Sequence, residues 1–240
     1  MRLKVDGWLG RVEFAVLPPA CLLCGAAAGL RRDLCAPCAA DLVRNDRACI
    51  ACAIPLAAGT RCGRCARRPP AHAKAWVPFV YGAPIDQLLT RLKFRGDLAA
   101  GRVLAGIALA RRPVDAALPD AIVPVPLHDS RLAERGYNQA LELARPWALA
   151  LHLPLLTDLV VRTRATPPQT GLSALARRRN LRNALRVTTT PPRHVAIVDD
   201  VMTTGTTLNE TARALRRAGC EIVEAWAVAR APRVGRESGA

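Results

Sequence analysis

Eight of the nine cysteines form four C-x2-C pairs within the first 65 residues, and this spacing constrains the fold more than any other feature. The pairs, separated by 10, 10 and 9 residues, are Cys21/Cys24, Cys35/Cys38, Cys49/Cys52 and Cys62/Cys65. A C-x2-C turn brings two thiolates to one tetrahedral Zn²⁺ ion, each sulfur at about 2.3 Å. Four turns supply ligands for two closed four-sulfur sites, which are structural because no position remains for water.

Spacing alone leaves the pairing of these turns open. Sequential pairing gives two zinc ribbons, and interleaved pairing also satisfies the spacing. A disulfide framework is the weaker interpretation, because the sequence shows no signal peptide and a reducing compartment is therefore expected. A redox C-x-x-C motif would explain one pair and not four. Zinc binding, at about 10–16 kcal/mol per site, would replace the hydrophobic core that this segment lacks.

After Arg67-Arg68-Pro69-Pro70 the pattern changes to strands that alternate with helices. The expected strands are 75–81, 121–125, 155–161, 194–199 and 221–229, and the expected helices are 85–94, 97–111, 131–151 and 206–218. Such alternation predicts an α/β fold with a parallel sheet and helices on both faces, preceded by the small Cys-rich module. No run of about 18 apolar residues free of charge occurs, so no membrane insertion is expected.

The string VAIVDDVMTTGTTL, from Val195 to Leu208, carries the strongest functional signal. A buried strand ends in Asp199 and Asp200, at the edge where open α/β sheets bind ligands. The small residues that follow allow backbone N–H groups to approach an oxyanion, and a helix N-terminus adds partial positive charge. Two carboxylates there are explained if they hold ribose hydroxyls or a bridging Mg²⁺. The alternative is an acidic strand end with a threonine-rich turn and no ligand.

This string closely resembles the phosphoribosyl-pyrophosphate (PRPP) motif of type I phosphoribosyltransferases, whose acidic pair contacts the ribose hydroxyls while the loop wraps the 5-phosphate. The resemblance implies that Asp199 and Asp200 hold the ribose, with Mg²⁺ accompanying PRPP. The residues that it assigns to the phosphate are Thr203, Thr204, Gly205, Thr206 and Thr207.

A second resemblance extends over roughly residues 18–230. The motifs Leu92-Lys-Phe94, Val123-Pro-Val-Pro126 and Arg135-Gly-Tyr-Asn-Gln139, with the cysteine pairs, are similar to those of the competence protein F (ComF) family. That family joins a zinc module to a type I phosphoribosyltransferase fold and is linked to bacterial DNA uptake on the cytoplasmic side. The resemblance implies a double zinc ribbon at 18–68, a phosphoribosyltransferase-like domain at 71–232 and a cytoplasmic location.

Two basic segments take expected roles from the same resemblance. The loop after strand 121–125 is where type I enzymes hold pyrophosphate, with Arg131 and Arg135 as candidates. Segment 162–182 corresponds to a mobile loop that closes over PRPP, with the candidate contacts Arg162, Arg164, Gln169 and Arg178. For the run Arg177–Arg179 the alternative is a solvated helix face.

The net charge of +16 is unevenly distributed, since residues 159–198 contain eight arginines and no acid. This favours an anionic partner, either PRPP or a related phosphorylated sugar, or single-stranded DNA. Aromatic residues make up only 4%, so DNA binding would depend on phosphate contacts. The functional hypotheses are a transferase with an unidentified acceptor, a PRPP-binding protein that handles DNA, and a scaffold for a DNA-uptake helicase.

Overall fold

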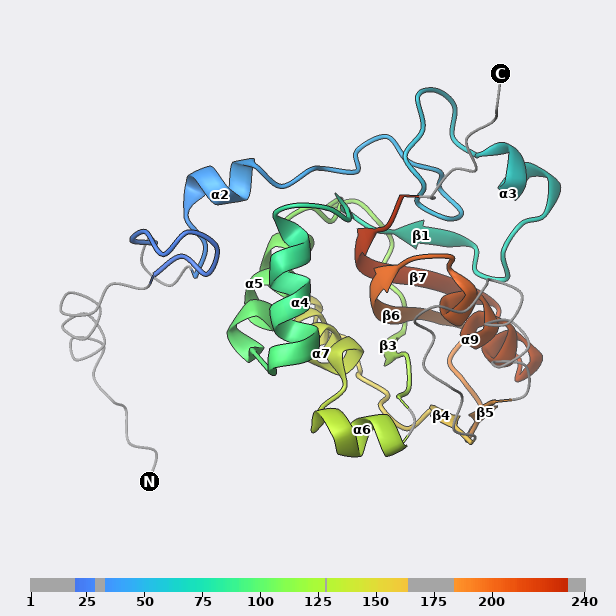
Figure 1. The fold of residues 1–240 in the computed structure, drawn as a ribbon. Coiled ribbons are helices and arrows are strands. Elements are labelled where there is room, and N and C mark those ends of the chain that lie inside the picture. Colours follow the sequence, from blue (N-terminus) through green and yellow to red (C-terminus); the bar gives the residue numbers. More distant parts are fainter. Residues whose placement is uncertain (1–19, 29–32, 128, 164–183, 233–240) are drawn as a thin grey trace, which may run out of the picture.

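The computed structural model describes residues 20–28, 33–127, 129–163 and 184–232 (Figure 1). Its centre is a five-stranded parallel sheet in which β3 (Ala121–Pro124), β6 (His194–Met202) and β7 (Ile222–Arg230) lie side by side. The remaining strands, β1 (Lys74–Trp76) and β2 (Phe79–Val80), both pair with β7. A second, antiparallel pair consists of β4 (Val160–Arg162) and β5 (Leu185–Val187).

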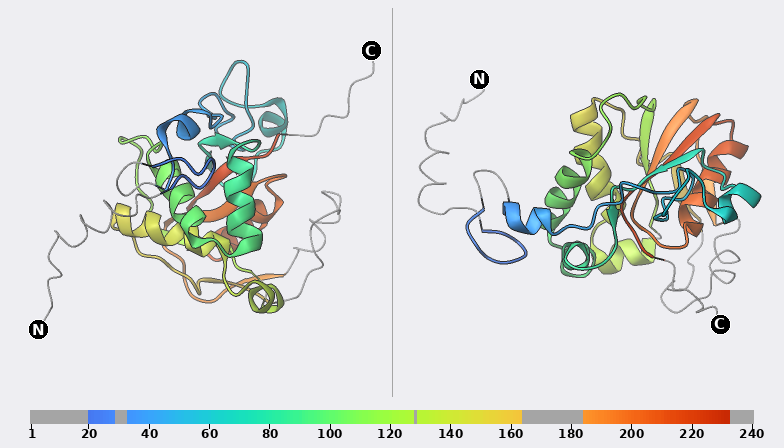
Figure 2. Two further views of the ribbon diagram at one scale, coloured as in Figure 1. Left: turned by 60° about the vertical axis from the view of Figure 1, so that its left-hand side comes forward. Right: turned by 90° about the horizontal axis from the view of Figure 1, so that it is seen from above.

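Helices cover both faces of the parallel sheet, as the views in Figures 1 and 2 show. One face carries α4 (Ile85–Arg95), α5 (Leu98–Leu109) and α7 (Gln139–Leu151), and the other carries α9 (Thr206–Arg217). In β6, Ala196 and Val198 pack into the first core while Val195 and Ile197 pack into the second. This alternation has the two-residue period of a strand buried on both sides. The predicted fold class is confirmed.

The cysteine segment contributes the short helices α2 (Ala36–Ala40) and α3 (Gly63–Arg67), and α6 (Asp129–Arg135) precedes α7. Side-chain caps fix two of the longer helices. Asp97 accepts from the Ala100 N–H at the start of α5, and Asn138 accepts from the Ala140 N–H at the start of α7. Within the described ranges, no helix combines the length and the apolar character needed to cross a membrane.

Four of the expected elements either divide in two or differ from the structure by more than two residues at one end. The helix expected over 131–151 divides into α6 and α7, because Gly136 adopts a φ of 77° and Asn138 begins a new helix. The strand expected at 194–199 continues to Met202, since Val201 and Met202 still pair with β7. The strand expected at 75–81 divides into β1 and β2. In the segment 155–161, Leu155 makes one bridge to Ile122 of β3, whereas Val160 and Val161 pair with β5 in the second sheet.

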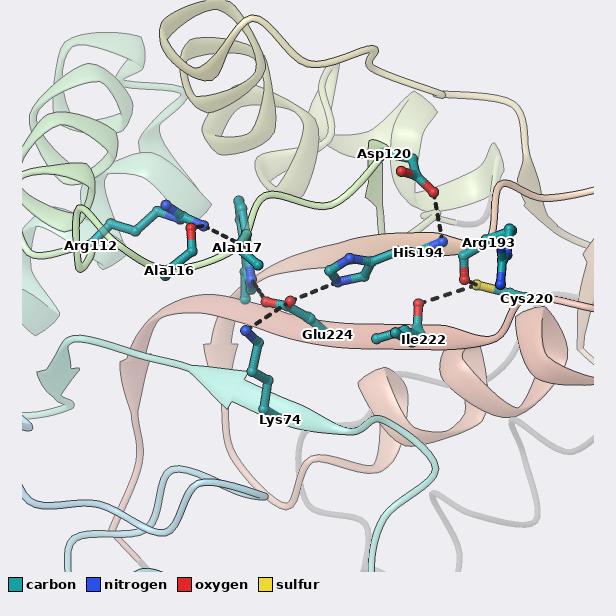
Figure 3. A network of polar contacts seen from close by, with 11 residues as sticks. Lys74, Arg112, Ala116, Ala117, Asp120, Arg193, His194, Cys220, Ile222 and Glu224 are labelled. Atoms are coloured by element: carbon teal, nitrogen blue, oxygen red, sulfur yellow. Dashed lines mark hydrogen bonds and ion pairs between the residues drawn. The ribbon is translucent and has the colours of Figure 1, made fainter.

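A buried carboxylate joins three elements at the amino-terminal end of the sheet (Figure 3). Glu224 in β7 is 2% exposed. Its carboxylate accepts from His194 Nε2 at 2.7 Å and from Trp226 Nε1 at 2.9 Å, and it lies 3.1 Å from Lys74 Nζ. These donors compensate the desolvation of the charge, so the network aligns β1, β6 and β7.

We expect Glu224→Gln to lower the free energy of unfolding by about 1–3 kcal/mol, because its partners lose a charged acceptor. Urea denaturation measures this change. Glu221→Gln is the matched control, since the Arg193–Glu221 pair at 2.8 Å is 82% and 54% exposed. The control should cost less than about 1 kcal/mol. Equal losses in the two variants would contradict the role of burial.

Candidate functional site

The four cysteine pairs combine sequentially into two clusters. Cys21, Cys24, Cys35 and Cys38 form the first, and Cys49, Cys52, Cys62 and Cys65 form the second, with all ligand sulfurs of a cluster within 4.8 Å of one another. The Sγ–Sγ separation is 3.7 Å for Cys24 and Cys35 and 3.8 Å for Cys52 and Cys62. Four sulfurs at 2.3 Å from a tetrahedral zinc ion lie about 3.8 Å apart. The residues therefore fit zinc, and all nine cysteines are free of disulfides.

The second ribbon is attached to the α/β domain by its own backbone. Four consecutive carbonyls, those of residues 50–53, each accept a hydrogen bond from a group outside the cluster. In carbonyl order, the donors are the Ala75 N–H (2.7 Å), His72 Nε2 (2.7 Å), Arg230 Nε (2.8 Å) and Asn45 Nδ2 (2.9 Å). Burial lowers the pKa of His72, so its imidazole is neutral and carries the donated proton on Nε2.

The acidic pair lies near the carboxyl end of β6 and not at its last residue. Asp200 is 9% exposed, and its Oδ2 lies 3.9 Å from the Nζ of Lys93 in α4. Burial, together with the neighbouring Asp200 carboxylate, raises the pKa of Asp199 well above its usual value. The pair therefore holds unfavourable negative charge, which a bound cation would relieve.

The residues between β6 and α9 form a tight loop with exposed donors. Gly205 adopts a φ of 73° as the residue before α9, a conformation that favours glycine. Thr204 Oγ1 and Thr206 Oγ1 lie 2.8 Å apart, and the Thr206 N–H donates to Thr204 Oγ1 at 3.3 Å. With the N-terminus of the 12-residue α9, these groups can donate to an anion such as phosphate. We call residues 203–207 the phosphate loop.

Three predicted basic residues lie on elements near the acidic pair. Burial and the charge of Arg135 lower the pKa of Arg131 in α6. Burial and the charge of Arg131 also lower the pKa of Arg162 in β4, while the charge of Asp199 opposes this shift. The charges of Arg131 and Arg162 therefore act on each other, and the charge of Asp199 acts on Arg162. Arg135 turns toward Phe94, with its Cζ 5.9 Å from the ring centre.

The remaining predicted contacts, Arg164, Gln169 and Arg178, lie outside the described residues. Two site residues escaped the sequence reasoning. Lys93 lies in the motif Leu92-Lys-Phe94, but its contact with Asp200 joins positions 107 apart, which no local pattern reveals. Arg230 is the last residue of the apolar strand β7, and a charged residue at the end of a buried strand is the signal that the sequence offers for it.

The fold and the clusters define a class of protein, in which paired zinc ribbons precede a phosphoribosyltransferase domain. Family models agree: residues 14–66 match a double zinc ribbon domain and residues 138–238 a phosphoribosyl transferase domain. The two clusters are thus structural zinc sites.

Relatives narrow this class. The chain is 40% identical to competence protein F of Haemophilus influenzae, over 71% of this chain and 78% of that protein. It is 36% identical to DNA utilization protein YhgH of Escherichia coli, over 89% and 98%, and 26% identical to competence protein ComFC of Streptococcus pneumoniae, over 63% and 66%. The chain belongs to the family of competence protein F and YhgH.

Paired serine substitutions test the sequential arrangement of the zinc sites. Cys24→Ser with Cys35→Ser should remove one zinc ion, because both ligands belong to the first cluster. Cys24→Ser with Cys52→Ser should remove both ions. Zinc content by mass spectrometry under native conditions measures the loss. Interleaved pairing of the first turn with the third and the second with the fourth would give the reverse result.

Proposed function

We propose that this protein binds PRPP with Mg²⁺ at the carboxyl end of β6 and that it acts in bacterial DNA uptake. The observation that supports the pocket most strongly is that three kinds of group occur on β6, on the loop that follows it and on the nearby elements α6 and β4. These are the acidic pair Asp199–Asp200, the donors of the phosphate loop, and the guanidinium groups of Arg131 and Arg162. PRPP presents matching parts, namely a ribose diol, a 5-phosphate and a pyrophosphate.

Each group has a role in that assignment. The phosphate loop donates backbone N–H groups and threonine hydroxyls to the 5-phosphate, aided by the dipole of α9. Asp199 and Asp200 accept from the ribose hydroxyls. Mg²⁺, when bound with PRPP, would supply positive charge to the acidic pair. Arg131 and Arg162 stabilise the pyrophosphate, and their charge counters the charge that develops if it leaves.

The role in DNA uptake comes from the relatives, which are named for competence and for DNA utilization. In that role the partners are PRPP, single-stranded DNA and a DNA-uptake helicase, and the compartment is the cytoplasm. An active transferase of nucleotide metabolism is the alternative. Pyrophosphate release from PRPP, measured across a panel of bases and amines, distinguishes the two.

Asp199→Asn should abolish PRPP binding measured by titration calorimetry with Mg²⁺, and it should also stabilise the free protein. Because folding raises the pKa of Asp199, this carboxyl costs folding free energy at every pH above the ordinary pKa of an aspartate. Removing the charge should therefore raise Tm at neutral pH, by about 2–4 °C. For the same reason, wild-type affinity should fall as the pH is lowered through the raised pKa of Asp199. Retained binding in this variant would contradict the assignment.

A second observation favours direct contact with single-stranded DNA. A groove of about 540 Å³ lies between the second ribbon and α9, and four arginines line it: Arg61, Arg213, Arg216 and Arg217. It shares Pro69, Pro70, His72 and Arg213 with a cavity of about 290 Å³ that reaches Thr204 to Thr206 of the phosphate loop. The two hollows adjoin along α9, where Arg213 of the groove pairs with Glu210 of the smaller cavity at 3.3 Å.

The composition of this groove favours phosphates over bases. Among the described residues, no carboxylate and no phenylalanine, tyrosine or tryptophan lines the 540 Å³ groove. A polynucleotide held there would be bound through its backbone, with little dependence on sequence and a strong dependence on salt.

Arg61→Glu with Arg217→Glu should weaken binding of a labelled single-stranded oligonucleotide and reduce its salt dependence. The slope of log affinity against log salt should fall by about 0.7 per lost phosphate contact, as measured by fluorescence anisotropy. Arg145→Glu on α7 is the control, because this exposed arginine pairs with Glu142 on the face of the sheet opposite α9. An unchanged slope in the double variant would exclude the groove.

A further inference from the structure

Arg230 connects the second zinc ribbon to the phosphate loop. It is the last residue of β7 and is 2% exposed. Its Nε donates to the carbonyl of Cys52 at 2.8 Å, and its Nη1 donates to the carbonyl of Met202 at 2.7 Å. Nη1 also contacts the carbonyl of Thr203, the first residue of the phosphate loop. One buried side chain thus bonds both segments.

The chemistry of arginine makes this connection stiff. The guanidinium group is planar and presents its donors in a fixed fork, so two carbonyls that bind it are held at a fixed relative position. Cys52 is also a ligand in the second cluster. The path from the zinc ligand to Thr203 therefore runs through one residue and two hydrogen bonds.

Other hydrogen bonds hold the turn that carries the Cys52 carbonyl. The carbonyls on either side of Cys52 accept from the buried side chains of His72 and Asn45, at 2.7 Å and 2.9 Å. On the loop side, Met202 O also accepts from the Ala231 N–H at 3.1 Å. Neither end of the Arg230 contact can shift without breaking other buried hydrogen bonds, each of which is costly to lose.

The first ribbon has contacts of a different kind. Its carbonyl at Leu22 accepts from Arg91 in α4, and Asp33 lies 3.9 Å from Arg102 in α5. Its buried side chains, such as Leu34, pack in the core that contains these helices. Among the described residues, the polar contacts of the first ribbon with the α/β domain reach α4 and α5, and none reaches β6 or α9. The first ribbon is therefore an internal control for any effect that the second ribbon has on the phosphate loop.

We propose that Arg230 is a positioning residue through which the second zinc ribbon holds the phosphate loop in its ligand-binding conformation. Zinc occupancy in the second cluster and ligand binding at the loop are then coupled, whereas the first cluster is independent. This inference rests on the proposed PRPP site and adds a regulatory input to it, because loss of one structural zinc ion lowers affinity at the loop.

Arg230→Lys tests the connection by binding. Lysine keeps the charge but cannot bond Cys52 and Met202 with a planar fork. PRPP affinity, measured by titration calorimetry with Mg²⁺, should fall about tenfold. Glu224→Gln is the matched control, since it alters a buried charge in the same strand at the opposite end of the sheet. It should lower stability and leave affinity unchanged.

Zinc release tests the coupling in the opposite direction, because thermodynamic coupling between two sites is reciprocal. PRPP with Mg²⁺ should slow transfer of zinc from the second cluster to a chromophoric chelator by about fivefold. Release from the first cluster should not change. The pair Cys24→Ser with Cys35→Ser leaves only the second zinc, and Cys52→Ser with Cys62→Ser leaves only the first, so the two rates can be assigned. A purely structural role for Arg230 would not produce this selective effect.

The outcomes separate the two proposals. If wild-type protein does not bind PRPP, the proposed function fails and the inference fails with it. If wild-type protein binds PRPP but the ligand does not change zinc release from the second cluster, the inference is overturned and the proposed function stands. Should Arg230→Lys fail to fold, the release measurement on wild-type protein decides alone. Selective protection of the second zinc, lost in Arg230→Lys, supports the inference.

Discussion

The second zinc cluster holds a short turn of backbone in a shape that the rest of the protein uses as a docking surface. Zinc fixes the four sulfurs, and the carbonyls of residues 50–53 then all point to donors from outside the cluster. Buried carbonyls without partners would cost free energy, so the turn and the α/β domain must meet in this arrangement. The ribbon, the sheet edge and the phosphate loop are consequently parts of one polar network.

The candidate site beside this network contains an acidic group and a separate cationic group. The acidic pair lies at the sheet, with a raised pKa at Asp199, while cationic groups approach from α4, α6 and β4. The free protein pays an electrostatic cost within the acidic group and within the cationic group, because like charges in each lie close together and are partly desolvated. A ligand with anionic ends and a metal-binding centre would relieve both costs, which is the physical reason to favour a magnesium–diphosphate sugar over a simple anion.

Local sequence patterns predicted which helices and strands form, but they predicted the first and last residues of these elements less accurately. The apolar runs predict the buried strands β3, β6 and β7, and the helix predicted at 206–218 corresponds to α9. The prediction of one helix over 131–151 was wrong, because Asn138 divides that segment. Its side chain caps α7 and also donates to the carbonyl of Val125 in the loop after β3. Likewise β6 continues past its acids because β7 offers pairing partners, which the sequence of β6 does not encode.

The sequence by itself determined which atoms are available for chemistry. Cysteine spacing set two four-sulfur zinc sites, and the string around Asp199 and Gly205 set an acidic pair followed by a phosphate loop, because both patterns are local and need only a turn or a strand end. Tertiary structure decided the sequential zinc pairing, the contact of Lys93 with Asp200, and the bonds of Arg230 to Cys52 and Met202. These depend on which distant segments the packing of the sheet brings into contact, and a linear pattern carries no record of that packing.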